Sequence, residues 1–293
     1  MTTDAYRSCR LCPRACGVDR TAGATGVCRV GANLRVARAA LHLWEEPCLV
    51  GDKGSGAVFF SGCGLGCTYC QNRTISRGDA GAEISVERLS EIFLELEAAG
   101  AANVNLVTGT QFLPSILPAL DAARAKGLSL PVVWNSGGYE TLETLDELRG
   151  YADIFLPDFK YAKSETARDY SHAPDYPEVA RVAIERMLEI SGAPVFTPDG
   201  RLLRGDGDPA ASAPGASARS QNRALAGLPA LRERRDLQSD AAVHPAAGAA
   251  RSAKSARDRP RVFLVRSSRR VARRRARVHA GARVGGGEFH PAV

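Results

Sequence analysis

The chain has 293 residues, of which 44% are hydrophobic, and it carries a formal net charge of +7. This length and composition suit a globular protein with one large α/β domain or two smaller ones, and no run of about 18 uncharged apolar residues is present to cross a membrane. The first residues are polar and include no apolar segment of signal-peptide length, so we expect a cytoplasmic protein without a membrane partner.

The excess positive charge lies in the carboxy-terminal part of the chain. Residues 206–293 contain 18 Lys and Arg against 7 Asp and Glu, whereas residues 1–205 are mildly acidic. This tail is dominated by Ala, Arg, Gly and Pro and has little apolar periodicity, so we expect it to be disordered. Its composition also matches a GC-rich gene read in a shifted frame from about residue 205. Few aromatic residues are available there to stack on bases, so nucleic-acid binding is a less favoured interpretation.

Between residues 51 and 205, short apolar runs alternate with stretches of helical periodicity. This alternation predicts four βα units that contribute to a parallel sheet, preceded by a cysteine-rich segment in residues 1–50. The fold class we predict is therefore α/β. The expected strands cover residues 57–60, 103–108 and 130–134, with a fourth opening at residue 154 and a fifth near residue 201. The expected helices cover residues 85–100, 114–127, 141–149 and 177–192.

Polar clusters follow three of the predicted strands, in residues 63–70, 135–138 and 158–160. In α/β folds, ligands bind at the carboxyl ends of parallel strands. Ordinary turn chemistry explains the second cluster as readily as a functional role does. It explains the first cluster poorly, because that cluster contains three cysteines.

The eight cysteines all lie between Cys9 and Cys70, and without an export signal this distribution favours metal ligation over disulfides. Cys63, Cys67 and Cys70 have the spacing C-x3-C-x2-C. One compact loop with this spacing places three thiolates around an iron–sulfur cube and leaves the fourth iron open. A zinc site would need a fourth ligand, for which Cys48 is the remaining nearby thiol, and a buried structural group of cysteines is the other alternative.

Four further cysteines form a second group, Cys9, Cys12, Cys16 and Cys28. Four thiolates make a closed site, either structural zinc or an auxiliary 4Fe-4S cluster. The segment is too poor in apolar residues to bury a core, so a metal would supply its folding free energy. Free buried cysteines remain the alternative. Cys48 matches neither group, and we expect it to serve packing.

Together these motifs resemble the radical S-adenosylmethionine (SAM) superfamily, and more closely proteins akin to pyruvate formate-lyase activating enzyme. The resemblance covers residues 9–205. It rests on the motifs Cys9-x2-Cys12-Pro13-Arg14-x-Cys16, Glu45-Glu46-Pro47, Phe60-Ser61-Gly62-Cys63, Cys70-Gln71-Asn72, Asn105-Leu106-Val107-Thr108 and Leu156-Pro157-Asp158-Phe159-Lys160-Tyr161. It implies a partial (β/α) barrel with a 4Fe-4S cluster on the C-x3-C-x2-C loop. It also implies reductive cleavage of S-adenosylmethionine to a 5′-deoxyadenosyl radical that abstracts hydrogen from a substrate.

The resemblance assigns cofactor-binding roles to individual residues. Tyr69 matches the aromatic residue that lies near the adenine in the family, and Asp158 and Lys160 match an Asp-x-Lys pair whose lysine would meet the methionine carboxylate. An exposed strand-end lysine with a solvated partner is the alternative for Lys160. Asn135, in the second polar cluster, completes the cofactor-binding candidates, and no catalytic residue is assigned.

The chain also departs from the family. Where superfamily members often carry Gly-Gly-Glu to bind the amine of the cofactor, this sequence has Thr108-Gly109-Thr110-Gln111. By resemblance the partners would be a glycyl-radical-type protein substrate and an electron donor such as flavodoxin or ferredoxin. The alternatives are a non-catalytic metal-binding protein or an inactive truncated product, because the last two strands of the family's barrel are not recognisable.

Overall fold

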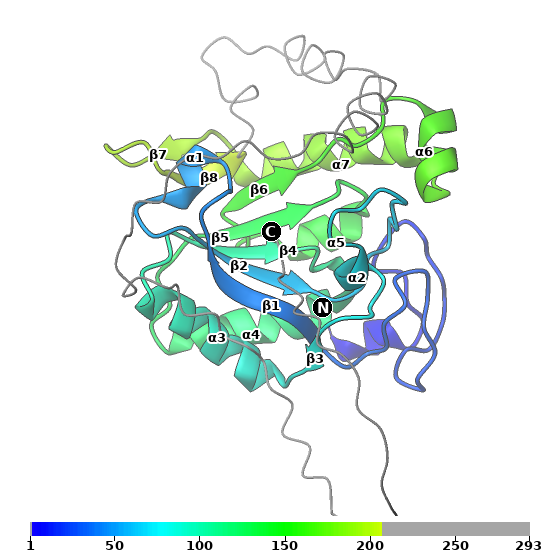
Figure 1. Ribbon diagram of the computed structural model, residues 1–293, viewed down its shortest axis with the longest axis horizontal. Coiled ribbons are helices and arrows are strands. Elements are labelled where there is room, and N and C mark those ends of the chain that lie inside the picture. Colours follow the sequence, from blue (N-terminus) through cyan, green and yellow to red (C-terminus); the bar gives the residue numbers. More distant parts are fainter. Residues whose placement is uncertain (1, 207–293) are drawn as a thin grey trace, which may run out of the picture.

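The computed structural model describes residues 2–206. The expected disorder and the frame shift of the tail concern residues 206–293, which lie outside the described residues except for Asp206. A curved eight-stranded sheet, in the order β3-β1-β2-β4-β5-β6-β8-β7, dominates this part of the chain (Figure 1). The strands are β1 (Arg35–His42), β2 (Ser55–Phe60), β3 (Ala82–Glu83), β4 (Val104–Val107), β5 (Val132–Ser136), β6 (Ile154–Pro157), β7 (Val195–Phe196) and β8 (Leu202–Asp206).

Seven α-helices and two short 3-10 helices connect these strands. They are η1 (Thr3–Tyr6), α1 (Pro47–Val50), α2 (Arg73–Ser76), α3 (Val86–Ala98), η2 (Thr110–Phe112), α4 (Leu113–Ala125), α5 (Leu142–Glu147), α6 (Ser164–Ser171) and α7 (Tyr176–Ser191). None of the helices within residues 2–206 has both the length and the apolar character needed to span a membrane.

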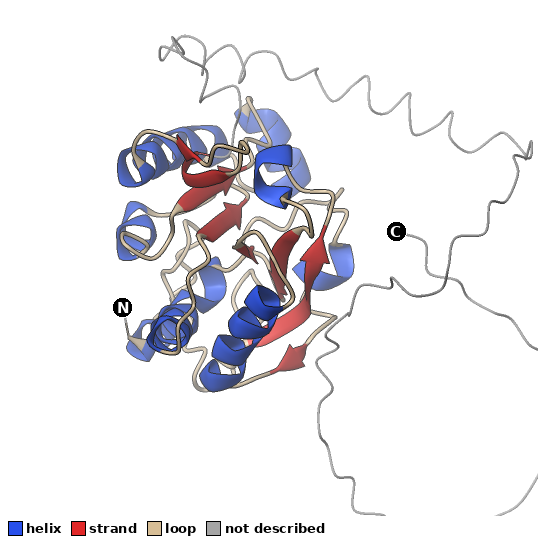
Figure 2. Cartoon of the chain, turned by 90° about the vertical axis from the view of Figure 1, so that its left-hand side faces the viewer, coloured by secondary structure: helices blue, strands red, loops and turns tan. Residues whose placement is uncertain are grey.

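The centre of the sheet is parallel, as the alternation of strands and helices predicted. Strands β2, β4, β5, β6 and β8 run in one direction, and β1 pairs antiparallel with β2 at the other side. The described sheet ends at β3 on one edge and at β7 on the other, so it forms an open arc and not a closed barrel (Figure 2). The carboxyl ends of the parallel strands all meet at one edge of this arc.

The convex face of the sheet carries the main hydrophobic core. Phe93 and Leu96 of α3 are completely buried, as is Trp134 of β5. Each such side chain contributes roughly 1.5–3 kcal/mol relative to remaining exposed. On the concave face a smaller cluster joins Leu49 of α1 to strands β5, β6 and β8, and Cys48 packs against it. The role in packing that we expected for Cys48 agrees with this position.

The helix boundaries follow local signals. The Ser85 hydroxyl accepts a hydrogen bond from the Arg88 backbone N–H at 3.1 Å and so caps α3, as predicted. Strand β5 begins two residues later than we predicted, because Leu130 packs outside the ladder and Pro131 lacks an N–H to donate. Asn135 is therefore part of this strand and not of the loop after it.

Candidate functional site

The cysteine loop, residues 63–70, leaves the carboxyl end of β2 through a turn that requires glycine. Gly62 has φ +84°, and a Cβ there would lie 2.5 Å from the Cys28 carbonyl oxygen. The Gln111 side-chain amide lies 3.0 Å from the Ser61 carbonyl oxygen and 3.1 Å from that of Gly62, and donates to both. Ser61 and Gly62, which immediately precede the loop, are thus held by the buried side chain of Gln111 in the turn after β4.

The loop brings its three cysteines into mutual electrostatic contact. Burial raises the pKa of the Cys63 thiol, and the neighbouring Cys67 and Cys70 raise it further. Cys63 and Cys67 pack against an aromatic cluster that includes Leu65, Tyr139, Tyr161 and Tyr176. Within residues 2–206, no three Cys, His, Asp or Glu side chains are already drawn together at metal-binding distances.

Tyr69 lies on the loop with its ring partly exposed to solvent. Its relative exposure is 44%, and it meets the rings of Tyr161 and Tyr170 edge to face at centroid distances of 6.0 and 5.8 Å. The ring is therefore held by two aromatic neighbours while part of its surface stays open to solvent.

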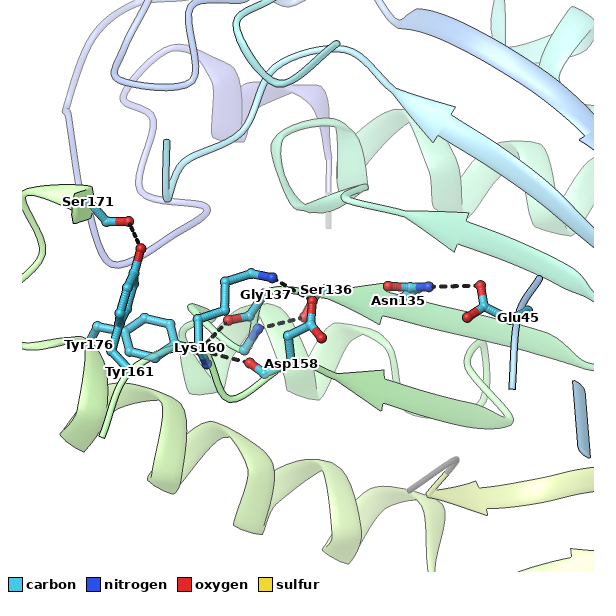
Figure 3. A network of polar contacts seen from close by, with 10 residues as sticks. Glu45, Asn135, Ser136, Gly137, Asp158, Lys160, Tyr161, Ser171 and Tyr176 are labelled. Atoms are coloured by element: carbon cyan, nitrogen blue, oxygen red, sulfur yellow. Dashed lines mark hydrogen bonds and ion pairs between the residues drawn. The ribbon is translucent and has the colours of Figure 1, made fainter. Parts of the chain in front are cut away.

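Lys160 and Asp158 form an ion pair beside the cysteine loop (Figure 3). Lys160 Nζ lies 2.6 Å from Asp158 Oδ2. Burial lowers the pKa of Lys160, but the Asp158 carboxylate outweighs burial and raises it overall. A Cβ on Gly137 would lie 3.3 Å from the Leu65 side chain in the loop and 3.5 Å from Lys160 Cε, so the lysine side chain and the loop both approach this glycine.

The backbone around this ion pair is held by one tyrosine. Tyr176 Oη lies 2.8 Å from the Gly137 carbonyl oxygen and 2.7 Å from that of Asp158, and it accepts a hydrogen bond from the Lys160 backbone N–H at 2.8 Å. Figure 3 shows these contacts joining the ends of β5 and β6. The second and third polar clusters of the sequence therefore meet in space.

Asn135 lies apart from that pair, on the concave face of the sheet. Its side-chain amide is 3.4 Å from Glu45 Oε2 (Figure 3). The same oxygen accepts a hydrogen bond from the Asn105 side-chain amide at 2.8 Å. Burial raises the pKa of Glu45. The structure thus groups Tyr69, Asp158 and Lys160 around the cysteine loop and places Asn135 in a separate polar group.

Comparison with known proteins gives a family match for the part of the chain that carries this site. Residues 57–196 match the family described as the Radical SAM superfamily. This part of the chain is therefore similar to that superfamily. The uncharacterized protein MJ0674 of Methanocaldococcus jannaschii is 30% identical to the chain over 183 residues, which cover 60% of this chain and 52% of the relative. The chain therefore spans about half the length of this relative.

Radical SAM proteins in general use a 4Fe-4S cluster and S-adenosylmethionine, and the donor set of the loop fits such a cluster. Three thiols lie on one turn that follows a parallel strand, at the edge where ligands bind in α/β folds. Cys63 and Cys67 pack against a cluster of buried aromatic and apolar side chains. Because burial favours the protonated thiol at Cys63, cluster binding there must release protons.

The amino-terminal cysteines lie next to the radical SAM domain. Cys9 and Cys28 are buried, and the backbone N–H of Val27 lies 3.4 Å from Cys16 Sγ. Burial raises the pKa of Cys12 to about 12, with Glu140, Cys28 and Cys16 adding to the effect. The four thiols that spacing grouped together are therefore also neighbours in the fold.

Glu140 is a buried carboxyl group that the sequence analysis did not single out. Burial raises its pKa to about 7, and Thr110, Ser136 and Trp134 oppose the change. Glu140 Oε1 accepts a hydrogen bond from the Thr110 hydroxyl at 2.7 Å. Trp134 is close enough to affect the pKa of Glu140, but within the described residues neither Trp134 Nε1 nor Glu140 Oε2 has a hydrogen-bond partner.

Arg14, Arg20 and Gln111 were also missed as site residues. Arg20 is 1% exposed and lies against the rings of Tyr6 and Phe112, 4.7 and 5.5 Å from their centroids. All three side chains donate hydrogen bonds to backbone carbonyl groups that are distant in the sequence. Contacts of this kind leave no local sequence pattern by which they could be predicted. The only available signal was an arginine placed inside a cysteine motif.

Proposed function

We propose that this chain is a radical SAM iron–sulfur enzyme in which Cys63, Cys67 and Cys70 hold the catalytic 4Fe-4S cluster. The observation that carries the proposal is the placement of the three-thiol loop at the carboxyl end of β2, where the Lys160 side chain and the loop both approach Gly137. An open coordination position on the cluster and the Lys160 ammonium group beside it suit S-adenosylmethionine, whose methionine part carries an amine and a carboxylate.

Each side chain near the loop has a distinct task in this proposal. Lys160, held by Asp158, binds the methionine carboxylate as a point charge. Tyr69 presents its partly exposed ring to the adenine, and Tyr176 fixes the backbone from which Lys160 projects. Asn135 offers its amide to the cofactor from the concave face.

The bound cluster and cofactor supply reductive cleavage of S-adenosylmethionine and a 5′-deoxyadenosyl radical that removes hydrogen from the substrate. The protein orients the cofactor and excludes water. The aromatic cluster around Cys63 and Cys67 performs the second task, since it surrounds the loop with apolar surface.

The substrate class we propose is a protein, with a glycyl-radical-type partner as in pyruvate formate-lyase activating enzymes. A flavodoxin or ferredoxin would provide the electron. Both proposals rest on the motifs shared with those enzymes, since a fold alone does not determine a reaction.

The amino-terminal cysteines are proposed to hold a second metal, either zinc or an auxiliary iron–sulfur cluster. Their proximity and the raised pKa of Cys12 support a group of thiols that metal binding would deprotonate together. Metal analysis of a variant lacking Cys63, Cys67 and Cys70 tests this. Bound zinc or iron is expected, and a metal-free variant would exclude the second site.

The function itself is tested by reconstituting the chain anaerobically, reducing it and measuring 5′-deoxyadenosine. Formation of this product is expected. Cys67→Ala should abolish it, whereas Cys48→Ala, a matched thiol outside both cysteine groups, should retain it. Iron and sulfide bound in equal amount by a Cys63, Cys67, Cys70 triple variant would contradict the assignment of the cluster.

A further inference from the structure

Arg14 connects the amino-terminal cysteine segment, residues 9–28, to the cysteine loop. Its Nε lies 2.9 Å from the Gly64 carbonyl oxygen and its Nη2 lies 3.2 Å from that of Leu65. These two carbonyl groups belong to the three residues that separate Cys63 from Cys67. The guanidinium group therefore binds the stretch of backbone that spaces two proposed cluster ligands.

The same guanidinium group also binds the end of α6. Its Nη1 and Nη2 lie 2.5 Å from the carbonyl oxygens of His172 and Ser171. Carbonyl groups at a helix end have no partner within the helix and carry partial negative charge, so a cation stabilises them. The ring of Tyr139 lies 5.4 Å from Arg14 Cζ and supports its other side.

The carboxyl end of α6 packs directly against the cysteine loop. The Thr68 backbone N–H donates to the Tyr170 carbonyl oxygen at 2.9 Å. The Ser171 hydroxyl is 2.6 Å from Tyr161 Oη, and Tyr161 borders Cys67. One arginine thus binds both the loop and the helix end against which the loop lies.

The cysteine segment touches the loop directly as well. A Cβ on Gly64 would lie 3.0 Å from Cys12 Sγ, so the segment packs on the loop without intervening side chains. Arg14 itself lies between Cys12 and Cys16 in the sequence. Any metal held by these two thiols fixes the backbone on either side of Arg14, and with it the origin of the guanidinium group.

We propose that Arg14 is a positioning residue through which the amino-terminal cysteine segment sets the geometry of the cluster-binding loop. This rests on the proposed function for the identity of the cluster. The four contacts of Arg14 with backbone carbonyl groups, which we call the clamp, form without any cluster. The segment orders Arg14, and Arg14 orders the loop by occupying its carbonyl groups. Loss of the segment's ligands and loss of Arg14 therefore act on the cluster by the same route.

The experiment compares full-length variants reconstituted anaerobically. Arg14→Ala removes the clamp, Arg14→Lys keeps its charge, and a Cys12→Ala, Cys16→Ala double variant removes two thiols from the segment. Arg10→Ala is the matched control, because Arg10 is exposed on the same segment and forms no hydrogen bond or ion pair within residues 2–206. The readouts are the electron paramagnetic resonance spectrum and midpoint potential of the reduced cluster. Amide hydrogen exchange of residues 64–70 is measured in the metal-free protein.

Arg14→Ala is expected to alter the spectrum and potential and to speed loop exchange about tenfold, the effect of one net charge-assisted hydrogen bond. The double cysteine variant should give the same altered spectrum, and adding Arg14→Ala to it should change nothing further. Arg14→Lys should recover only part of the change, since one ammonium group does not reach four carbonyl groups. Arg10→Ala should match the parent protein.

A parent-like spectrum and parent-like loop exchange in Arg14→Ala would overturn the proposal, as would strictly additive effects of Arg14 and the two cysteines. If the parent chain takes up no cluster, the proposed function fails. Amide hydrogen exchange of residues 64–70 in the metal-free variants then tests alone whether Arg14 orders the loop. If circular dichroism shows that Arg14→Ala does not fold, Arg14→Lys supports the same comparison with Arg10→Ala as its control.

Discussion

Glu140→Gln replaces the buried carboxyl group behind β5 with a neutral group of the same shape. Glu140 is 3% exposed, and its pKa is raised from 4.5 to about 7 because burial disfavours the carboxylate. Glutamine retains an oxygen that can accept the hydrogen bond from Thr110. The variant therefore resembles the protonated form of Glu140 at every pH.

The raised pKa makes the stability of the parent protein depend on pH in a defined direction. The folded state holds the Glu140 proton up to about pH 7, whereas the unfolded state releases it near pH 4.5. This stabilisation is fully present below the unfolded pKa and is lost as pH rises through the folded value. The difference corresponds to about 3 kcal/mol, most of which disappears between pH 5 and pH 8.

Urea denaturation of the metal-free protein at pH 5 and pH 8 measures this effect. The free energy of unfolding of the parent should fall by about 2.5 kcal/mol more than that of Glu140→Gln over this interval. Glu143→Gln is the matched control, since Glu143 is an exposed carboxylate three residues away, and it should follow the parent. A difference between parent and Glu140→Gln below about 1 kcal/mol would refute a carboxyl group that is neutral in the folded state.

Three further substitutions test the site. Lys160→Ala should weaken S-adenosylmethionine binding by roughly tenfold or more, measured by titration calorimetry, and leave the cluster absorbance intact; unchanged affinity would contradict its role. Gln111→Ala leaves three carbonyl groups without their donor and should lower the free energy of unfolding by about 2 kcal/mol, with faster cluster loss to a chelator; parent-like cluster retention would refute its hold on the loop. Gly62→Ala should destabilise the fold by about 3 kcal/mol, measured by urea denaturation, because its Cβ meets the Cys28 carbonyl oxygen; a neutral effect would show that this turn relaxes.

The periodicity of apolar residues and the glycine and proline residues at element ends were enough to predict the parallel centre of the sheet. Leu89, Phe93 and Leu96 repeat at helical spacing and are all buried in the core. Strand β1 was missed, because its sequence Arg35–His42 contains charged residues and the two-residue edge strand β3 pairs with only its first two positions. Helix α6 was missed for a similar reason, since only Ala167 and Ser171 of its eight residues are buried.

The candidate site was predictable where its residues are close in sequence. The spacing of Cys63, Cys67 and Cys70 identified one loop, and the strand pattern placed Lys160 at the same edge of the sheet. Residues that act across long sequence separations were not predictable. Arg14 reaches Gly64, which lies 50 residues away in the chain, and a carbonyl acceptor has no signature in the sequence.

Gln111 lies in the segment where this chain departs from the pattern expected of the superfamily. The Gly-Gly-Glu stretch expected after the second parallel strand is replaced by a sequence that ends in an amide. That amide donates to the carbonyl groups of Ser61, Gly62 and Thr108, and a carboxylate at the same position has no proton to donate to any of them. Thr108 adopts φ +56°, a strained value for a β-branched residue, and the amide bound to its carbonyl group stabilises that turn. The Gln111 side chain therefore holds the backbone that leads into the cysteine loop.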